Sequence, residues 1–189
     1  MMQLIKNANL FDGFSSQLQK NVSVIIRDNL VQEIATGAIP EDQFDRVIDA
    51  GGRTVMPGIV EGHGHMSGVG TKLMRDQMRE DEIVVLSVRY AQLLLNSGIT
   101  TVRDGGSLVY GLKAGIDKGI IDGPRIFPSH AALSQTCGHG DGRTNRAQLN
   151  TPFGSTSPYM RAKIMETCDG APEITRKVRD QLFLGASQI

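Results

Sequence analysis

The stretch Pro57-Gly58-Ile59-Val60-Glu61-Gly62-His63-Gly64-His65 decides how this chain is interpreted. Its apolar part, with the β-branched Ile59 and Val60, is typical of a buried strand, and two histidines follow at the carboxyl end. Successive side chains of a strand point to opposite faces, so His63 and His65 are expected on the same face. Neutral imidazole is a good ligand for zinc and similar cations. The stretch therefore predicts two metal ligands at the end of a strand.

An isolated His-x-His pair is more often two hydrogen-bonded polar residues than a metal site. Here the surrounding sequence favours the metal site. Pro57-Gly58 and an apolar segment precede the histidines, and strand-like and helical patterns alternate after them. Such alternation is typical of parallel sheets, whose active sites lie at the carboxyl ends of the strands.

From Thr54 onward the sequence predicts βα units. Strands are expected at 54–60, 99–103 and 124–128, with a fourth beginning at 186–189, and helices at 81–97, 108–118 and 172–185. Between the third strand and the last helix, residues 129–172 are expected to form a long loop. A (β/α)8 TIM barrel needs about 250 residues. Residues 57–189 are therefore expected to form the first half of one.

The first 56 residues have a different pattern. Short strands are expected at 3–5, 22–27, 30–34 and 46–49, with a hairpin turn at Asp28-Asn29. Gly51-Gly52 is expected to form a tight turn before the next element. Residues 1–56 are therefore predicted to be a small β-sandwich unit outside the barrel.

The composition limits the possible functions. The chain has 189 residues, 40% of them hydrophobic and 21% charged, which is ordinary for a globular protein. Its formal net charge is zero, so nucleic acid is not an expected partner. No apolar run reaches the ~18 residues that a membrane span needs. Cys137 and Cys168 lack metal-binding or disulfide-framework spacing, which fits the reducing cytoplasm.

The stretch 57–65 resembles the first-strand signature of the amidohydrolase superfamily, Pro-Gly-x-x-Asp-x-His-x-His, with Glu61 where aspartate is usual. The β unit before it resembles the N-terminal half-sandwich of that superfamily. Two further strings, Gly98–Gly106 and Gly123–Ser129 followed by Gly138–Asp141, resemble the subgroup related to imidazolonepropionase. That subgroup includes prolidase-like and carboxypeptidase-like enzymes that cleave dipeptides or N-acyl amino acids.

The resemblance implies a centre with two divalent metal ions, expected to be zinc, one of them held by His63 and His65. It also implies a carboxylated lysine from strand four, histidines from strands five and six, and an aspartate from strand eight. These groups, and with them the catalytic residues, are expected beyond residue 189. Gly185–Ile189 matches the string that precedes the lysine in the subgroup, so a modified lysine is expected at position 190.

Several other residues have open alternatives. His139, in a glycine-flanked loop, is expected to bind substrate, although it could equally order its own turn. His130 is expected to pack behind the site rather than to act in it. Asp104 could orient a metal ligand or accept hydrogen bonds from loop amides. Arg143 and Arg146 could bind a substrate carboxylate, but solvated loop arginines are commoner.

The leading functional hypothesis is a metal-dependent amidohydrolase, a homo-oligomer, that cleaves a dipeptide (Xaa-Pro or Xaa-Arg/Lys) or an N-acyl amino acid. A second hypothesis is a cyclic-amide hydrolase of the imidazolonepropionase type. A third is a binding module that keeps the scaffold without the chemistry. The sequence that follows Ile189 separates the enzymes from the binding module, because only the enzymes require the later metal ligands.

Overall fold

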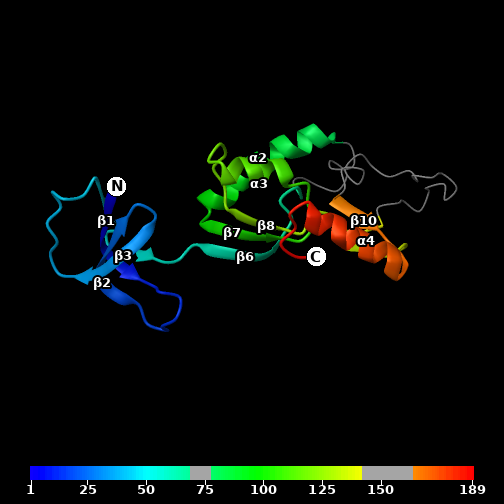
Figure 1. The fold of residues 1–189 in the computed structure, drawn as a ribbon. Coiled ribbons are helices and arrows are strands. Elements are labelled where there is room, and N and C mark those ends of the chain that lie inside the picture. Colours follow the sequence, from blue (N-terminus) through cyan, green and yellow to red (C-terminus); the bar gives the residue numbers. More distant parts are fainter. Residues whose placement is uncertain (69–77, 142–163) are drawn as a thin grey trace. The chain divides into compact units, whose positions relative to one another are not determined.

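The computed structural model describes residues 1–68, 78–141 and 164–189 (Figure 1). It separates into two compact units, Met1–Pro57 and Gly58–Ile189. The domain organisation of the protein as a whole, including the boundary expected at residues 56 and 57, stays a prediction. None of the helices in the described ranges has the length and hydrophobicity of a membrane span.

The first unit is a five-stranded sheet. Its strands are β1 (Met2–Leu10), β2 (Gln19–Arg27), β3 (Leu30–Thr36), β4 (Arg46–Asp49) and β5 (Thr54–Val55), in the order β3-β2-β1-β4, with β5 also pairing with β1. The β2–β3 hairpin turns at Asp28, whose φ of +56° lies in the left-handed region that aspartate tolerates. Leu10, Val22 and Val24 form the buried cluster of this unit.

The single strand expected at 54–60 is a wrong prediction. The segment divides into β5, which pairs with β1 of the first unit, and β6 (Ile59–Gly64), which belongs to the second. Pro57 has no N–H to donate to a sheet, so it interrupts the strand. Gly58 leaves no room for a side chain, since a Cβ would lie 2.1 Å from Thr100 Oγ1.

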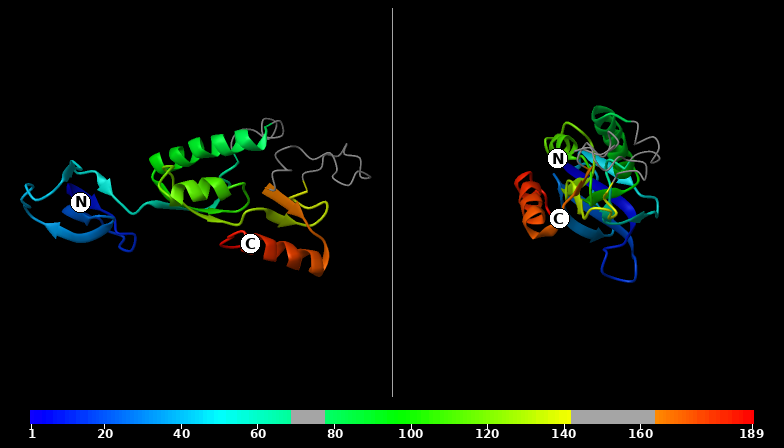
Figure 2. Two further views of the ribbon diagram at one scale, coloured as in Figure 1. Left: turned by 45° about the horizontal axis from the view of Figure 1, so that its top comes forward. Right: turned by 90° about the vertical axis from the view of Figure 1, so that its right-hand side faces the viewer.

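The second unit is built on a parallel sheet in the order β6-β7-β8, with β7 at Ile99–Asp104 and β8 at Arg125–Pro128. Helices α2 (Glu80–Asn96) and α3 (Tyr110–Asp117) cover one face of it (Figures 1 and 2). Helix α2 presents Ile83, Ser87 and Ala91 inward at a spacing of four residues. The helix ends at Asn96, and Gly98 follows two residues later with a φ of +88°, in the left-handed region that favours glycine.

The core of this unit lies between the sheet and the two helices. Its buried residues are Met66, Ala91, Val102, Val109, Leu112 and Ile126. On β6, by contrast, Ile59 and Val60 are 46% and 63% exposed. Parallel sheets normally bury both faces. The parallel strands and their helices confirm the α/β class. The described residues do not close a barrel, so the eight-stranded barrel stays an expectation for the protein as a whole.

The long loop expected over 129–172 contains regular structure. A short parallel pair, β9 (Ala132–Ser134) and β10 (Met165–Thr167), lies within it, and helix α4 (Gly170–Phe183) begins two residues before the expected Pro172. Cross-strand pairing of residues so far apart in sequence leaves no local periodicity to detect. Arg143 and Arg146 lie outside the described residues.

The fourth strand expected at 186–189 is not formed within the described residues. Instead, the Ser187 N–H donates to the Pro128 carbonyl at 2.7 Å. The Gln188 side-chain amide donates to the carbonyls of Asp104 and Phe127 at 3.0 and 2.9 Å. The end of the chain is thus held at the carboxyl ends of β7 and β8 by isolated hydrogen bonds rather than by a ladder.

Candidate metal centre

A β-bulge shapes the strand that carries the two histidines. Glu61 pairs with Val102 and Gly64 with Asp104, so β6 uses one residue more than β7 over this interval. Bulges bend a strand and redirect its side chains, and they occur often beside active sites. The Glu61 carboxylate accepts a hydrogen bond from the backbone N–H of His63 at 3.0 Å. Glu61 therefore orders the bulge that holds His63.

The imidazole rings of His63 and His65 lie close to each other. Their centroids are 5.1 Å apart and their planes are inclined by 88°. Both residues are exposed, and His65 comes directly after the last residue of β6. Coordination of a metal by this pair stays a prediction.

His65 has a defined hydrogen-bond partner. Its Nδ1 lies 3.1 Å from the carbonyl oxygen of Gly106. A carbonyl oxygen can only accept, so this contact requires the proton on Nδ1 and leaves the lone pair on Nε2. A ligating histidine usually donates its second ring N–H to a carbonyl or carboxylate in this way.

His63 is placed by a close contact with Gly105. A Cβ added at Gly105 would lie 2.9 Å from Cε1 of the His63 ring. Glycine at this position therefore provides the space that the ring occupies. The Gly105 N–H donates to the Gly64 carbonyl at 2.8 Å, which joins the turn after β7 to the end of β6.

Asp104, the last residue of β7, is completely buried. One carboxylate oxygen accepts from the Met66 N–H at 2.7 Å and the other from the Gly106 N–H at 3.1 Å. Of the two roles considered from the sequence, the acceptor for loop amides is the one observed. Asp104 thus ties Met66, the residue after His65, to the turn that contains Gly106, whose carbonyl contacts the His65 ring.

The histidine pair suits a metal, but it is only part of a site. Two imidazoles, one of them with its Nδ1 against the Gly106 carbonyl, are suitable donors for zinc. Within residues 1–68, 78–141 and 164–189, no three His, Cys, Asp or Glu side chains come together in a way that could hold a metal. Further ligands would have to come from outside the described part of the chain.

His139 lies on the exposed part of the loop after β9. Its turn is held by other residues: the Gly140 N–H donates to Ser134 Oγ at 3.0 Å, and the Cys137 N–H donates to the Asp141 carboxylate at 2.8 Å. In the described structure the His139 ring makes no hydrogen bond or ion pair. The described contacts therefore do not make His139 the residue that orders the turn, and its contact with substrate stays a prediction.

His130 is packed in the interior, 3% exposed, with a left-handed φ of +59°. Its ring stacks on Tyr110, with centroids 3.7 Å apart and planes 12° from parallel. Neither ring nitrogen forms a hydrogen bond of good geometry within the described residues, although the Leu184 backbone is close enough to favour protonation. Burial outweighs that effect and lowers the pKa of His130 below its usual value.

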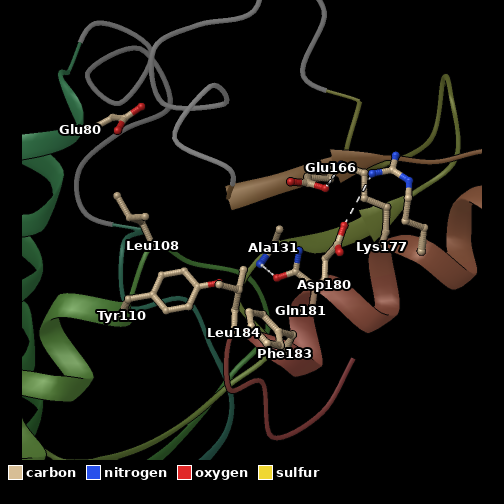
Figure 3. A pocket seen from close by; sticks show the side chains of 11 residues that line it. Glu80, Leu108, Tyr110, Ala131, Glu166, Lys177, Asp180, Gln181, Phe183 and Leu184 are labelled. Carbon is tan, nitrogen blue, oxygen red and sulfur yellow. Dashed lines mark hydrogen bonds and ion pairs between the residues drawn. The ribbon is translucent and has the colours of Figure 1, made fainter.

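A cavity of about 560 Å³ lies between helix α4, strand β10 and the loop before α3 (Figure 3). Its lining includes an ion pair between Lys177 and Glu166, and the amide of Gln181. Gln181 is 3% exposed, and its carbonyl oxygen accepts from the Ala131 N–H at 3.2 Å. The predicted metal ligands His63 and His65 and the predicted substrate contact His139 are not among the residues that line this cavity. Sequence reasoning missed it because its walls come from segments far apart in the chain.

Comparison with known proteins gives a consistent set of relatives. No family model matches the sequence. The ochratoxinase of Aspergillus niger is 28% identical over 186 residues, a match that covers 90% of this chain and 38% of that protein. The imidazolonepropionase of Picrophilus torridus is 32% identical over 100 residues, covering 50% of this chain and 23% of that protein.

Solved structures match along the whole chain. An amidohydrolase is 31% identical, with a TM-score of 0.83, and covers 100% of this chain and 46% of its own. A prolidase, solved in complex with N-methylphosphonate-L-proline, is 29% identical with a TM-score of 0.86 and the same two coverages.

The chain belongs to the amidohydrolase superfamily, in agreement with the resemblance of its histidine stretch. Within that superfamily its structural neighbours are prolidases and ochratoxinase, and imidazolonepropionases and deaminases are among its relatives in sequence. The chain spans less than half the length of the ochratoxinase and of the matched prolidase.

Proposed function

We propose that this chain is part of a metal-dependent amidohydrolase that cleaves the amide bond of a dipeptide or an N-acyl amino acid. The observation that carries the proposal is the pair of adjacent imidazoles at the carboxyl end of β6, with the second ring held by the Gly106 carbonyl. In superfamilies built on parallel βα units, this end of the strands is where chemistry takes place.

His63 and His65 would hold one divalent metal, proposed to be zinc. A metal bound there supplies a hydrolytic water of lowered pKa and polarises the scissile carbonyl. The chain's own contribution is orientation: Glu61 orders the bulge before His63, and Gly106 holds the His65 ring. The proposal also includes two further histidines, an aspartate and a second metal.

A carboxylated lysine is proposed at position 190. Gly185–Ile189 carries the string that precedes this lysine in the resembling subgroup. Carboxylation converts an ammonium, which a divalent cation repels, into an anionic oxygen ligand that can span two metals. Sequencing beyond Ile189 and mass spectrometry of the native protein test this point. Any residue other than lysine at position 190 would contradict it.

The substrate proposal is supported by the prolidase among the structural neighbours and by the Xaa-Pro dipeptidase, which is 28% identical with a TM-score of 0.77. His139 is proposed to contact the substrate rather than the metal. Its ring is exposed and makes no hydrogen bond or ion pair within the described chain, so it is available to a ligand. Neutral imidazole can donate to or accept from a substrate carbonyl or carboxylate.

A second candidate is a cyclic-amide hydrolase. The match to the imidazolonepropionase of Picrophilus torridus over 100 residues favours it. Both candidates use the same metal chemistry and differ only in the shape of the substrate. Activity on a cyclic amide without activity on dipeptides would select this second candidate.

The experiment is a metal analysis and substrate screen on the complete protein. Metal content is measured on the purified protein, and hydrolysis is assayed with Xaa-Pro, Xaa-Arg, Xaa-Lys and N-acyl amino acid panels. We expect bound zinc and hydrolysis of at least one panel. The matched control is the double variant His63→Ala/His65→Ala, which should lose both. Hydrolysis by the double variant at the unaltered rate would refute the proposed centre.

The enzyme is further proposed to be a cytoplasmic homo-oligomer that binds neither nucleic acid nor membranes. Both cysteines support the location: Cys137 is exposed and free, and Cys168 is buried and free. Free thiols persist in reducing compartments. Cell fractionation and light scattering of the complete protein test the location and the oligomeric state.

A further inference from the structure

Asp104 links the two segments that surround the proposed metal ligand His65. Its carboxylate is fully buried and both of its oxygens are used, one by the Met66 N–H and one by the Gly106 N–H. Met66 is the residue next to His65, and Gly106 carries the carbonyl that contacts the His65 ring. One carboxylate therefore fixes the backbone on both sides of that contact.

The Gly106 carbonyl is held in place from two directions. The peptide before it is fixed by Asp104, and the peptide after it is fixed because the Ser107 N–H donates to the His130 carbonyl at 3.0 Å. The φ of Gly106 is +143°, a conformation that residues with a side chain rarely adopt. The carbonyl cannot rotate away from His65 without breaking one of these hydrogen bonds.

We propose that Asp104 is a positioning residue of the metal centre. It fixes the position of the Gly106 carbonyl, and this carbonyl accepts the Nδ1–H of His65. The contact favours the Nδ1–H tautomer of His65. This tautomer presents the Nε2 lone pair to the metal. The inference rests on the proposed function in one respect, namely that His65 binds a metal. The hydrogen-bond relay from Asp104 through Gly106 to His65 can be measured without any metal.

A purely structural role for Asp104 gives a different expectation. If Asp104 only stabilised the turn, its replacement would lower the free energy of unfolding and leave the tautomer of His65 unchanged. If it positions His65, the tautomer itself changes. Groups that orient a ligating histidine typically contribute about 10- to 100-fold to metal affinity.

The first measurement is made on the complete, unaltered protein without metal. Its histidines are labelled with ¹⁵N, the His65 signals are assigned by their loss in His65→Gln, and the protonated ring nitrogen is identified by NMR. We expect the proton on Nδ1. A dominant Nε2–H tautomer in the unaltered protein would overturn the proposal without any need for a variant of Asp104.

The second measurement uses Asp104→Asn. The asparagine has the shape of the aspartate but one acceptor oxygen in place of two, so either Met66 or Gly106 loses its acceptor. We expect a mixture of His65 tautomers and a loss of about 10-fold or more in affinity for zinc. The matched control is Asp117→Asn, which removes an exposed carboxylate paired with Lys113 and should change neither.

The outcomes separate the two proposals. A His65 tautomer that is unchanged in a folded Asp104→Asn protein would overturn the positioning role. If the unaltered protein shows the Nδ1–H tautomer and the variant shows the mixture, but neither protein binds zinc, the relay stands and the proposed metal site is refuted. If Asp104→Asn loses both the tautomer preference and the zinc affinity, and the control Asp117→Asn keeps them, the positioning role and the metal site are both supported.

Discussion

Gly105 lies against the ring of His63 so closely that a Cβ at this position would come within 2.9 Å of Cε1. No left-handed backbone angle is involved, so the glycine is explained by space rather than by conformation. Because Gly105 also donates to the Gly64 carbonyl, the turn after β7 and the bulge of β6 form one packed unit around the ring. The position of His63 is therefore set by a residue 42 positions away in the sequence.

The variant Gly105→Ala tests this contact. The added methyl group should displace the His63 ring and weaken zinc binding by about 10-fold, with little change in the free energy of unfolding. Gly111→Ala is the matched control, because a Cβ at Gly111 in helix α3 meets nothing within 4 Å. The control should leave zinc affinity unchanged. Zinc titration by calorimetry measures the effect, and equal affinities in the two variants would argue against the packed unit.

Single replacements of the histidines should separate metal binding from substrate binding. His63→Ala and His65→Ala each remove a predicted ligand and should reduce bound zinc in the purified protein. His139→Ala should keep the metal and lower kcat/KM, because it removes only a substrate contact. Metal analysis and steady-state kinetics on the same preparations provide both readouts. Loss of zinc from His139→Ala would reassign this residue to the metal.

Gln181→Leu should destabilise the packing of helix α4. The buried Gln181 carbonyl oxygen accepts the Ala131 N–H, and leucine leaves this donor without a partner. An unsatisfied buried donor costs about 1–3 kcal/mol. Thr175→Leu, at an exposed position of the same helix, should change the free energy of unfolding by no more than about 0.5 kcal/mol. Urea denaturation distinguishes the two, and an equal effect of both variants would contradict the role of Gln181.

Stability should fall as the solution becomes acidic because of His130. Burial lowers its folded-state pKa below the unfolded value of 6.5, although Asp104 acts in the opposite direction. The unfolded chain then binds the proton more readily, so this contribution is fully present above pH 6.5 and is lost as the pH falls toward the folded pKa. Thermal unfolding measured between about pH 7.5 and about pH 5.5, roughly one unit either side of the ordinary pKa of histidine, gives the slope.

His130→Gly removes the titrating group and keeps a residue that accepts the φ of +59°. Its stability should depend less steeply on pH than that of the unaltered protein. His139→Ala removes an exposed histidine instead and should leave the slope as it is. A slope in His130→Gly equal to that of the unaltered protein would assign the acid sensitivity to other groups.

Local patterns predicted the elements whose partners are near in sequence. The spacing of apolar residues predicted α2 to within one residue at either end, and the Asp28 turn predicted the β2–β3 hairpin. In both cases neighbouring residues along the chain specify the element. The sequence pattern did not predict that the strand is interrupted at Pro57-Gly58, because apolar residues occur on both sides of the interruption. The residues before it pair with β1 of the first unit, and those after it pair with β7 of the second.

The sequence by itself determined that His63 and His65 stand together at the end of a strand, since their separation by one residue fixes this in any extended segment. Only the tertiary structure decided how the rings are held. Asp104, Gly105 and Gly106 become their neighbours because β7 pairs in parallel with β6 and ends at the same edge of the sheet. A contact across about 40 residues leaves no local pattern, because the backbone hydrogen bonds and close packing that create it exist only after the sheet has formed.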